Sequence, residues 1–271
     1  MEKIDKIGFI GGGNMAEAVI RGVIKSGLYK RRDVIVSDVD ESRRQYCRRS
    51  LGVRTCADNL EAVRAAETTV LAVKPQQTEQ ALAELRQKLP KNTLLISIVT
   101  GYTTEKIAEL LGQSVRVMRV VPNTPALVGL SASAYCRGKG TTAHDRKLTK
   151  KILKSIGICI SLEERMMNAV TALSGSGPAY VFYLVEALMN AGRVIGLPEK
   201  KAKELVVTTV LGAARLLQET GLPAGELRRR VTSRKGTTEA AVKILDRKGV
   251  RKAFETAVQA AFKRAEELFA K

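Results

Sequence analysis

The stretch Lys6-Ile7-Gly8-Phe9-Ile10-Gly11-Gly12-Gly13-Asn14-Met15-Ala16 decides the fold. It opens with a short apolar run typical of a buried strand, and a helical pattern follows to about Gly27. Between them, Gly11, Gly13 and Ala16 match the G-x-G-x-x-A fingerprint. Its glycines allow a tight turn and the close approach of a pyrophosphate to the backbone. The strand before and the helix after favour a dinucleotide-binding unit over a plain turn.

Strand-like and helix-like segments alternate up to about residue 160. The segment 69–74 (TVLAVK), for example, is the continuous apolar run of a buried parallel strand. Further strands are expected at 33–37, 53–56, 93–99, 115–121, 131–135 and 158–160. Helices are expected at 41–51, 58–64, 77–88, 103–111 and 145–156. We expect 131–135 at the sheet edge, and the alternation predicts an α/β fold with a mostly parallel, doubly wound, Rossmann-like sheet.

The strand pattern ends near residue 162, and long helical patterns follow at 178–195, 199–220 and 250–269. We therefore predict a dinucleotide-binding domain over residues 1–162 and an all-helical dimerisation and substrate domain over 163–271. The apolar faces of these helices are broad, so they need partners within one chain or across a dimer.

Composition excludes several classes of protein. The chain has 271 residues and a net charge of +19, but its basic residues are spread throughout, which favours a solvated surface over a nucleic-acid partner. Four scattered cysteines and one histidine give no zinc set, and they suit reduced thiols in the cytoplasm. We expect no membrane span and, since the first strand begins so early, no signal peptide.

His144 is the only histidine, and it lies in a polar turn before an expected helix. A Ser-His-Asp or Cys-His mechanism is therefore not expected. Hydride transfer to an imine needs no histidine, because a nicotinamide cofactor carries the reactive hydride and the protein mainly orients it.

Two segments combine small polar residues with the start of a helix. Ser174-Gly175-Ser176-Gly177-Pro178 is either an ordinary Gly/Ser turn or a helix start whose N–H groups bind a carboxylate or phosphate. The segment 231–240 (VTSRKGTTEA) has the same two interpretations, with Thr237 as a plain N-cap or as part of a second anion site.

Several polar residues follow expected strands at the edge where ligands bind in open α/β sheets. Asn59 could cap a helix or touch a nucleotide, and Lys74, which precedes Pro75, could be a surface charge or a ligand. Asn123 lies between two prolines at the same edge.

The residues after the second strand bear on the choice of cofactor. Asp38 is placed to bind a ribose 2′-hydroxyl, which selects NAD. Ser37, Arg43 and Arg44 instead suit the 2′-phosphate of NADP.

The chain resembles the pyrroline-5-carboxylate reductases along nearly its whole length. The resemblance is carried by GFIGGGNMAEA (8–18), LAVKPQ (71–76), SIVTG (97–101), RVVPNTPALVG (119–129), ALSGSGPAYVF (172–182) and GAARLLQETG (212–221). It implies reduction of 1-pyrroline-5-carboxylate to L-proline, the last step of proline biosynthesis. It also implies a homodimer formed by the helical domain, which in many members assembles into a decamer.

The resemblance also implies roles for individual residues. Those holding the cofactor would be Gly11, Gly13, Asn14, Met15, Ser37, Asn59, Lys74 and Pro75, with Asp38 beside them. Those around the substrate would be Ser176, Gly177, Ser233, Gly236, Thr237 and Thr238, with Thr238 closest to the imine nitrogen and catalytic. The family more often uses NADPH, so we expect NADPH, with NADH as the alternative and no metal.

One loop departs from the family pattern. TSRKGTT replaces the usual TSPGGTT, so that Arg234 and Lys235 stand where proline and glycine are usual. The change bears on substrate affinity and loop rigidity. It leaves two rival interpretations, namely a reductase of a related cyclic imino acid or β-hydroxyacid, and a catalytically silent paralogue.

Overall fold

The computed structural model describes residues 6–112 and 114–269. The chain forms two compact units: Met1–Ser176 together with Ala261–Lys271, and Gly177–Ala260. The division predicted between residues 162 and 163 remains a prediction. In the structure, the described residues up to Ser176 and those at 261–269 form one unit with the sheet. No described helix has the length and apolarity needed to cross a membrane.

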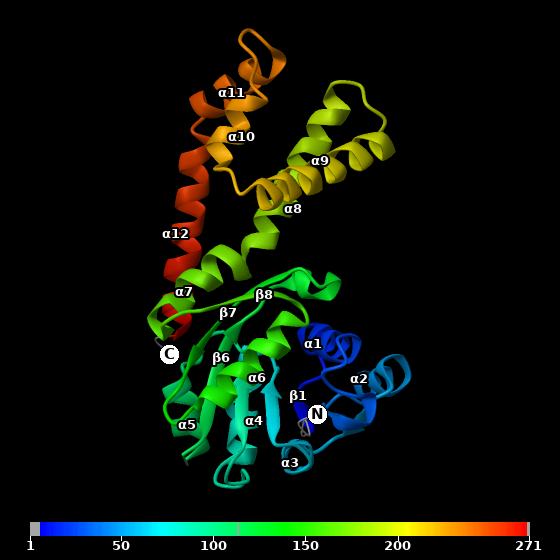
Figure 1. Cartoon of the computed structure of the whole chain (residues 1–271), viewed down its shortest axis with the longest axis vertical. Coiled ribbons are helices and arrows are strands. Elements are labelled where there is room, and N and C mark those ends of the chain that lie inside the picture. Colours follow the sequence, from blue (N-terminus) through cyan, green and yellow to red (C-terminus); the bar gives the residue numbers. More distant parts are fainter. Residues whose placement is uncertain (1–5, 113, 270–271) are drawn as a thin grey trace. The chain divides into compact units, whose positions relative to one another are not determined.

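The first unit is built on an eight-stranded sheet with the order β3-β2-β1-β4-β5-β6-β7-β8 (Figure 1). All neighbouring strands are parallel except β6 and β7, which are antiparallel. The strands are β1 Ile7–Ile10, β2 Val34–Ser37, β3 Arg54–Cys56, β4 Thr68–Leu71, β5 Leu94–Ser97, β6 Arg116–Val121, β7 Ser131–Arg137 and β8 Gly157–Ser161. This confirms the predicted doubly wound, mostly parallel sheet.

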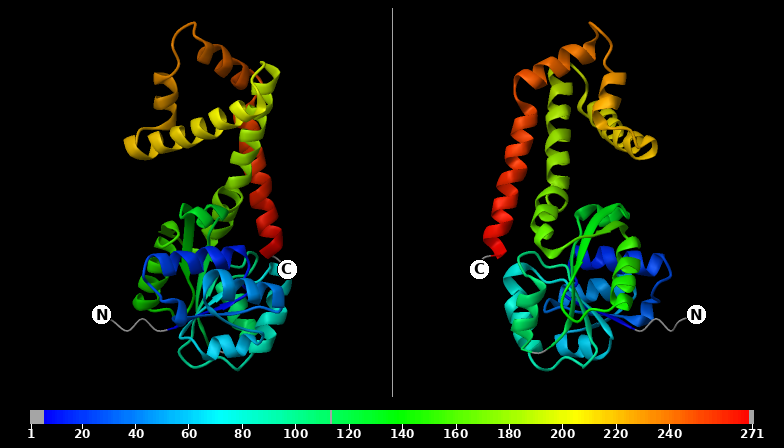
Figure 2. Two further views of the ribbon diagram at one scale, coloured as in Figure 1. Left: turned by 90° about the vertical axis from the view of Figure 1, so that its right-hand side faces the viewer. Right: turned by 60° about the vertical axis from the view of Figure 1, so that its left-hand side comes forward.

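Helices cover both faces of this sheet. The helices of the first unit are α1 Asn14–Lys25, α2 Glu41–Tyr46, α3 Asn59–Arg64, α4 Thr78–Leu85, α5 Thr104–Leu111, α6 Ala143–Lys154 and α7 Met167–Val170. Side chains of α1 and α6 pack with Ile7 and Phe9 in one core, whereas α3, α4 and α5 pack with Ile10 in the other. Figure 2 shows these layers on either side of the sheet. The side chains of β1 thus pack in the cores on both faces of the sheet, which is why the strand is apolar throughout.

The prediction of an edge position for 131–135 is wrong. Strand β7 lies between β6 and β8, and β8 forms the edge of the described sheet. The alternation that suggested an edge comes from Ser131 and Ser133, whose hydroxyl oxygens are 2.8 Å apart and buried. Asn123 accepts hydrogen bonds from the Ser131 hydroxyl and from the Ala132 N–H, so these polar positions are satisfied inside the protein.

Strand β8 begins at a glycine that the sheet leaves little room to replace. Gly157 has φ +150°, and it pairs with Ser131 of β7. A Cβ built on Gly157 would lie 2.1 Å from the Ser131 carbonyl oxygen and 2.4 Å from its nitrogen. The two backbones approach so closely that only glycine fits.

The second unit is entirely helical in the part that the structure describes. Its elements are α8 Gly177–Val194, α9 Glu199–Thr220, α10 Ala224–Arg230, α11 Thr237–Arg247 and the first part of α12 Val250–Phe269. Helices α8 and α9 meet where Gly192 and Ala202 are both buried, and a Cβ on Gly192 would lie 3.0 Å from that of Ala202.

Candidate dinucleotide site

A cleft of about 600 Å³ opens at the carboxyl ends of β1, β2 and β4. This edge of a doubly wound sheet, where β1 lies between β2 and β4, is the place where such folds bind ligands. The cleft brings together five of the predicted cofactor residues, together with Arg43, which was weighed for the 2′-phosphate. The five are Gly11, Gly13, Asp38, Asn59 and Lys74.

The glycine turn after β1 leaves the start of α1 open. Gly11 has φ +91°, and a Cβ there would lie 2.8 Å from the Ala72 carbonyl oxygen, so the turn requires glycine. Gly13 is the N-cap of α1, and a Cβ built on it would meet no described atom within 4 Å. Gly13 and Asn14 are exposed, whereas Ala16 is buried against the sheet. The first N–H groups of α1 can therefore face an anion such as a pyrophosphate.

Ser37 and Asn59 form a buried pair beneath the cleft. The Ser37 side chain is fully buried, and its hydroxyl lies 2.7 Å from Asn59 Oδ1 and 3.2 Å from the Phe9 carbonyl oxygen. Asn59 Nδ2 donates to Glu84 at 2.7 Å. The capping interpretation of Asn59 is wrong, because Asp58 is the N-cap of α3 and accepts from the Leu60 N–H.

Lys74 and Pro75 come directly after β4. Lys74 is exposed in the wall of the cleft, whereas Pro75 lines a neighbouring hollow of about 510 Å³. Lys74 is thus the positive side chain on the β4 side of the cleft, across from Asp38 at the end of β2.

A second hollow of the first unit, about 500 Å³, brings Met15 and Ser176 together. Asn123 fixes the chain leading to Ser176: its Nδ2 donates to the Ser174 carbonyl oxygen at 3.1 Å, and the Ser174 hydroxyl donates to the Ala132 carbonyl oxygen at 2.8 Å. Sequence placed Asn123 at this edge of the sheet but did not reveal its bond to Ser174, which lies 51 positions further along the chain.

The remaining predicted substrate residues lie in the second unit. Gly177 starts α8, and the other four surround the start of α11. The capping interpretation of Thr237 is wrong, because Gly236 is the N-cap and α11 begins at Thr237. A Cβ on Gly236 would lie 2.3 Å from Ser233 Oγ and 3.1 Å from the Ser233 carbonyl oxygen, so a larger residue would require the Ser233 side chain to rotate.

The unusual loop residue Lys235 adopts a left-handed conformation, with φ +58°. A left-handed conformation costs a residue other than glycine about 1–2 kcal/mol. The Lys235 N–H donates to Glu239 Oε2 at 2.5 Å, which closes the turn from the helix side. The side-chain hydrogen bond from Lys243, followed by that backbone bond, lowers the pKa of Glu239.

The described residues also bear on metal, thiol and histidine chemistry. No cluster of three or more metal-binding side chains occurs within residues 6–112 and 114–269. Burial raises the pKa of Cys56 to about 11 and that of Cys136 to about 12, so these thiols are not thiolates near neutral pH. His144 lies in the first turn of α6, after the N-cap Thr142.

Two family models and many relatives match this chain. Residues 6–101 match a family model described as NADP oxidoreductase coenzyme F420-dependent, and residues 164–268 match one described as pyrroline-5-carboxylate reductase dimerisation. A pyrroline-5-carboxylate reductase from Methanosarcina acetivorans is 39% identical over 97% of both chains. One from Arabidopsis thaliana is 40% identical over 97% of this chain and 95% of the relative.

Solved structures are similar over the same extent. A pyrroline-5-carboxylate reductase from Coxiella burnetii has a TM-score of 0.91 and 37% identity, covering 98% of this chain and 99% of that one. The Plasmodium falciparum pyrroline carboxylate reductase, solved with NADP bound, has a TM-score of 0.90 and 29% identity over 99% of both chains.

The sheet, the glycine turn and the open helix start define a dinucleotide-binding unit, and the family model and relatives make the protein an NAD(P)H-dependent oxidoreductase. With relatives this similar over nearly the full length, the chain belongs to the pyrroline-5-carboxylate reductase family.

Proposed function

We propose that this protein reduces 1-pyrroline-5-carboxylate to L-proline with NAD(P)H, as the last step of proline biosynthesis. The observation that carries the function is the 39% identity to a named reductase over 97% of the chain, joined to a cleft suited to a dinucleotide. Cytoplasmic location is part of the same proposal and is supported by four free cysteines, which suit a reducing compartment.

The residues of the cleft fit the cofactor. The α1 start at Gly13 and Asn14 would hold the pyrophosphate with backbone N–H groups, and Gly11 and Met15 adjoin it. Asp38 and Lys74 would lie along the nucleotide, with Pro75 next to Lys74. Ser37 and Asn59 would support that wall from beneath through their mutual hydrogen bond. When bound, the reduced nicotinamide supplies the hydride for the imine carbon.

The predicted substrate-binding residues would mainly orient the substrate. We assign its carboxylate to the small and hydroxyl-bearing residues Ser176, Gly177, Ser233, Gly236 and Thr237. They lie at or next to the starts of α8 and α11. The N–H groups of Ser176 and Gly236 already donate to the Thr171 and Ser233 carbonyl oxygens, so the hydroxyls and the N–H groups of the following residues are the donors that suit a carboxylate. Thr238, in the first turn of α11, hydrogen-bonds the imine nitrogen and holds the proton that this nitrogen gains.

Substitution of Thr238 tests this assignment. Thr238→Ala should lower turnover by about ten- to a hundredfold, the low end for one acid–base or positioning group. Turnover is measured as loss of the near-ultraviolet absorbance of the reduced cofactor with pyrroline-5-carboxylate. Thr256→Ala is the matched control, because Thr256 is an exposed helical threonine bonded to the Lys252 carbonyl oxygen. If both variants keep the wild-type rate, Thr238 is only structural.

The same assay separates the rival functions. The wild-type protein is offered pyrroline-5-carboxylate, other cyclic imines and β-hydroxyacids in parallel, with the opposite cofactor form for the hydroxyacids. Faster turnover of another cyclic imine would mean that the changed loop at Arg234 and Lys235 has altered the substrate preference. Oxidation of a hydroxyacid, but not reduction of pyrroline-5-carboxylate, would show that the protein is a hydroxyacid dehydrogenase. A protein that binds the cofactor but turns over none of these compounds would be a silent paralogue.

We propose a homodimer formed by the helices of the second unit, able to assemble into a decamer. Helices α8 and α9 expose large apolar side chains that a single chain leaves uncovered, among them Phe182, Tyr183, Leu205 and Leu211. Exposed apolar area of this extent marks an interaction surface. Light scattering at micromolar concentration should give the mass of two chains or a multiple of it. A stable monomer would contradict the proposal.

A further inference from the structure

The carboxylate of Asp38 is fixed at the end of β2 by two backbone hydrogen bonds. Its Oδ2 accepts from the Gly12 N–H at 2.7 Å, and its Oδ1 accepts from the Asp40 N–H at 2.9 Å. The side chain is partly exposed in the wall of the cleft. Since each carboxylate oxygen has two acceptor positions, both oxygens can still accept a hydrogen bond from a ligand hydroxyl.

Arg43, which sequence favoured for a 2′-phosphate, is already engaged by the protein. Its Nη2 lies 2.7 Å from Glu17 Oε2, its Nε donates to the Gly12 carbonyl oxygen, and its guanidinium carbon lies 4.5 Å from the centre of the Tyr46 ring. Burial raises the pKa of Glu17, but hydrogen bonds from Arg43, Tyr46 and Arg21 outweigh it and lower the pKa, so the pair is ionised near neutral pH. Arg43 is thus held beside the glycine turn.

Arg44 and Ser37 are engaged as well. Arg44 Nη1 donates to the Asp38 carbonyl oxygen at 2.6 Å, and Arg44 Nη2 donates to Glu41. Only 14% of the Arg44 side chain is exposed. Ser37 is fully buried and bonded to Asn59. The three residues that favoured NADPH on sequence therefore have partners in the protein. Arg43 and Asp38 both line the cleft, but the Arg43 guanidinium is bonded to Glu17 and Gly12, whereas the Asp38 oxygens can still accept from a ligand.

We propose that Asp38 makes this enzyme select NADH over NADPH. This rests on the proposed use of a nicotinamide cofactor by the cleft. An acid at the end of the second strand accepts from the ribose 2′-hydroxyl, and Asp38 lies 26 positions after Gly12 in that place. A 2′-phosphate offers no such donor when ionised, and it carries about −1.5 to −2 charge toward a fixed carboxylate. Selectivity comes from that repulsion as much as from the hydroxyl bond.

Calorimetric titration of the wild-type protein with NADH and NADPH, without substrate, gives the first test. We expect NADH to bind at least about tenfold more tightly, which corresponds to about 1.4 kcal/mol. Tighter binding of NADPH would overturn the proposal. Because the titration involves no turnover, the cofactor preference can fail while the reductase activity stands, and the reverse also holds.

Two variants identify the residue responsible. Asp38→Asn keeps an oxygen for the Gly12 N–H but removes the charge. NADPH should therefore bind more tightly, and the ratio Kd(NADPH)/Kd(NADH) should fall to about a third or less of its value in the wild-type protein. Arg43→Ala should change both affinities alike, whereas a selective loss of NADPH binding would show that Arg43 reads the phosphate. An unchanged ratio in Asp38→Asn would also refute the proposal.

The control is another aspartate with the same local role. Asp58 accepts a hydrogen bond from the Leu60 N–H at 2.8 Å, but it does not line the cleft. Asp58→Asn should therefore leave the ratio of the two affinities at the wild-type value. A shift as large as that of Asp38→Asn would mean that the net charge of the protein, rather than Asp38, sets the preference.

Discussion

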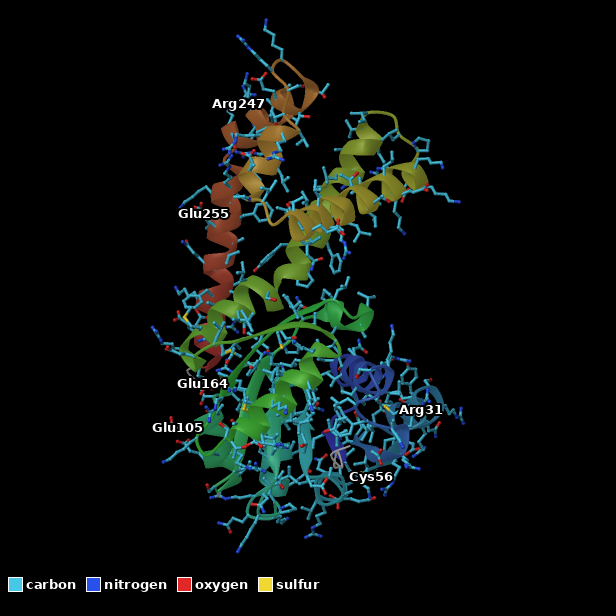
Figure 3. All side chains as sticks on the ribbon, viewed as in Figure 1. Arg31, Cys56, Glu105, Glu164, Arg247 and Glu255 are labelled. Atoms are coloured by element: carbon cyan, nitrogen blue, oxygen red, sulfur yellow. The ribbon has the colours of Figure 1, made fainter. Side chains whose placement is uncertain are left out.

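Replacing Glu164 with alanine should lower the free energy of unfolding by about 3–5 kcal/mol, the usual cost of removing one member of a buried ion pair. Glu164, labelled in Figure 3, begins the short turn that precedes α7. Its Oε1 lies 3.3 Å from Nη1 of Arg119, whose side chain is 2% exposed. A guanidinium cannot lose its proton near neutral pH, so the charge of Arg119 remains after the substitution.

The substitution also removes two hydrogen bonds at the start of α5. The Thr104 N–H and hydroxyl donate to Glu164 at 2.8 and 2.7 Å, respectively. The stability is measured by urea unfolding followed by circular dichroism. In a double-mutant cycle, Arg119→Met should recover part of the stability lost in Glu164→Ala, because it removes the buried charge at similar volume. A loss below about 1 kcal/mol in Glu164→Ala would show that water or another group replaces the carboxylate.

Gly157→Ala should cost about 2–5 kcal/mol of unfolding free energy, as the sum of overpacking and backbone strain. Its methyl group would meet the Ser131 carbonyl oxygen at 2.1 Å, and both contacting groups belong to the backbone, so no side chain can move aside. The β7–β8 pairing must open at its first residues.

A second glycine provides the control for the backbone term. Gly140 also has a positive φ, +77°, but a Cβ there would meet no described atom within 4 Å. Gly140→Ala should therefore cost only about 1–2 kcal/mol. If the two variants unfold at the same urea concentration, the close approach at Gly157 relaxes without cost and the explanation is incorrect.

Much of the fold could be predicted because buried parallel strands and amphipathic helices leave clear patterns in the sequence. The predicted helices 199–220 and 250–269 coincide with α9 and α12. The position of β7 could not be predicted, since the alternation of Ser131 and Ser133 depends on hydrogen bonds with a residue outside the strand. A polar residue looks the same in a sequence whether water or the protein satisfies it.

The position of the cleft could be predicted from the sequence, whereas the roles of its residues remain predictions. The glycine turn and the residues after β1, β2 and β4 meet in one cleft, as expected for ends of neighbouring parallel strands. Asn59 and Thr237 were considered as N-caps, but the observed N-caps are the preceding residues, Asp58 and Gly236. The sequence could not separate them because these residue types are about equally good caps. Arg43 contacts Glu17, 26 positions away, which no spacing rule selects, whereas Arg44 and Glu41 form an i, i+3 pair. The residues alone left both cofactors open, and the expectation of NADPH came from the family resemblance.

The division of the chain has a consequence for how the protein folds. The first unit contains residues up to Ser176 and then those after residue 260, and Ala265 there is buried in a hollow with Val121 and Met15. During synthesis the sheet can assemble early, but this contact must wait until the whole helical insertion has left the ribosome. Contacts of such long sequence separation slow folding. The sheet unit is thus complete only when its own distant segment has returned to it.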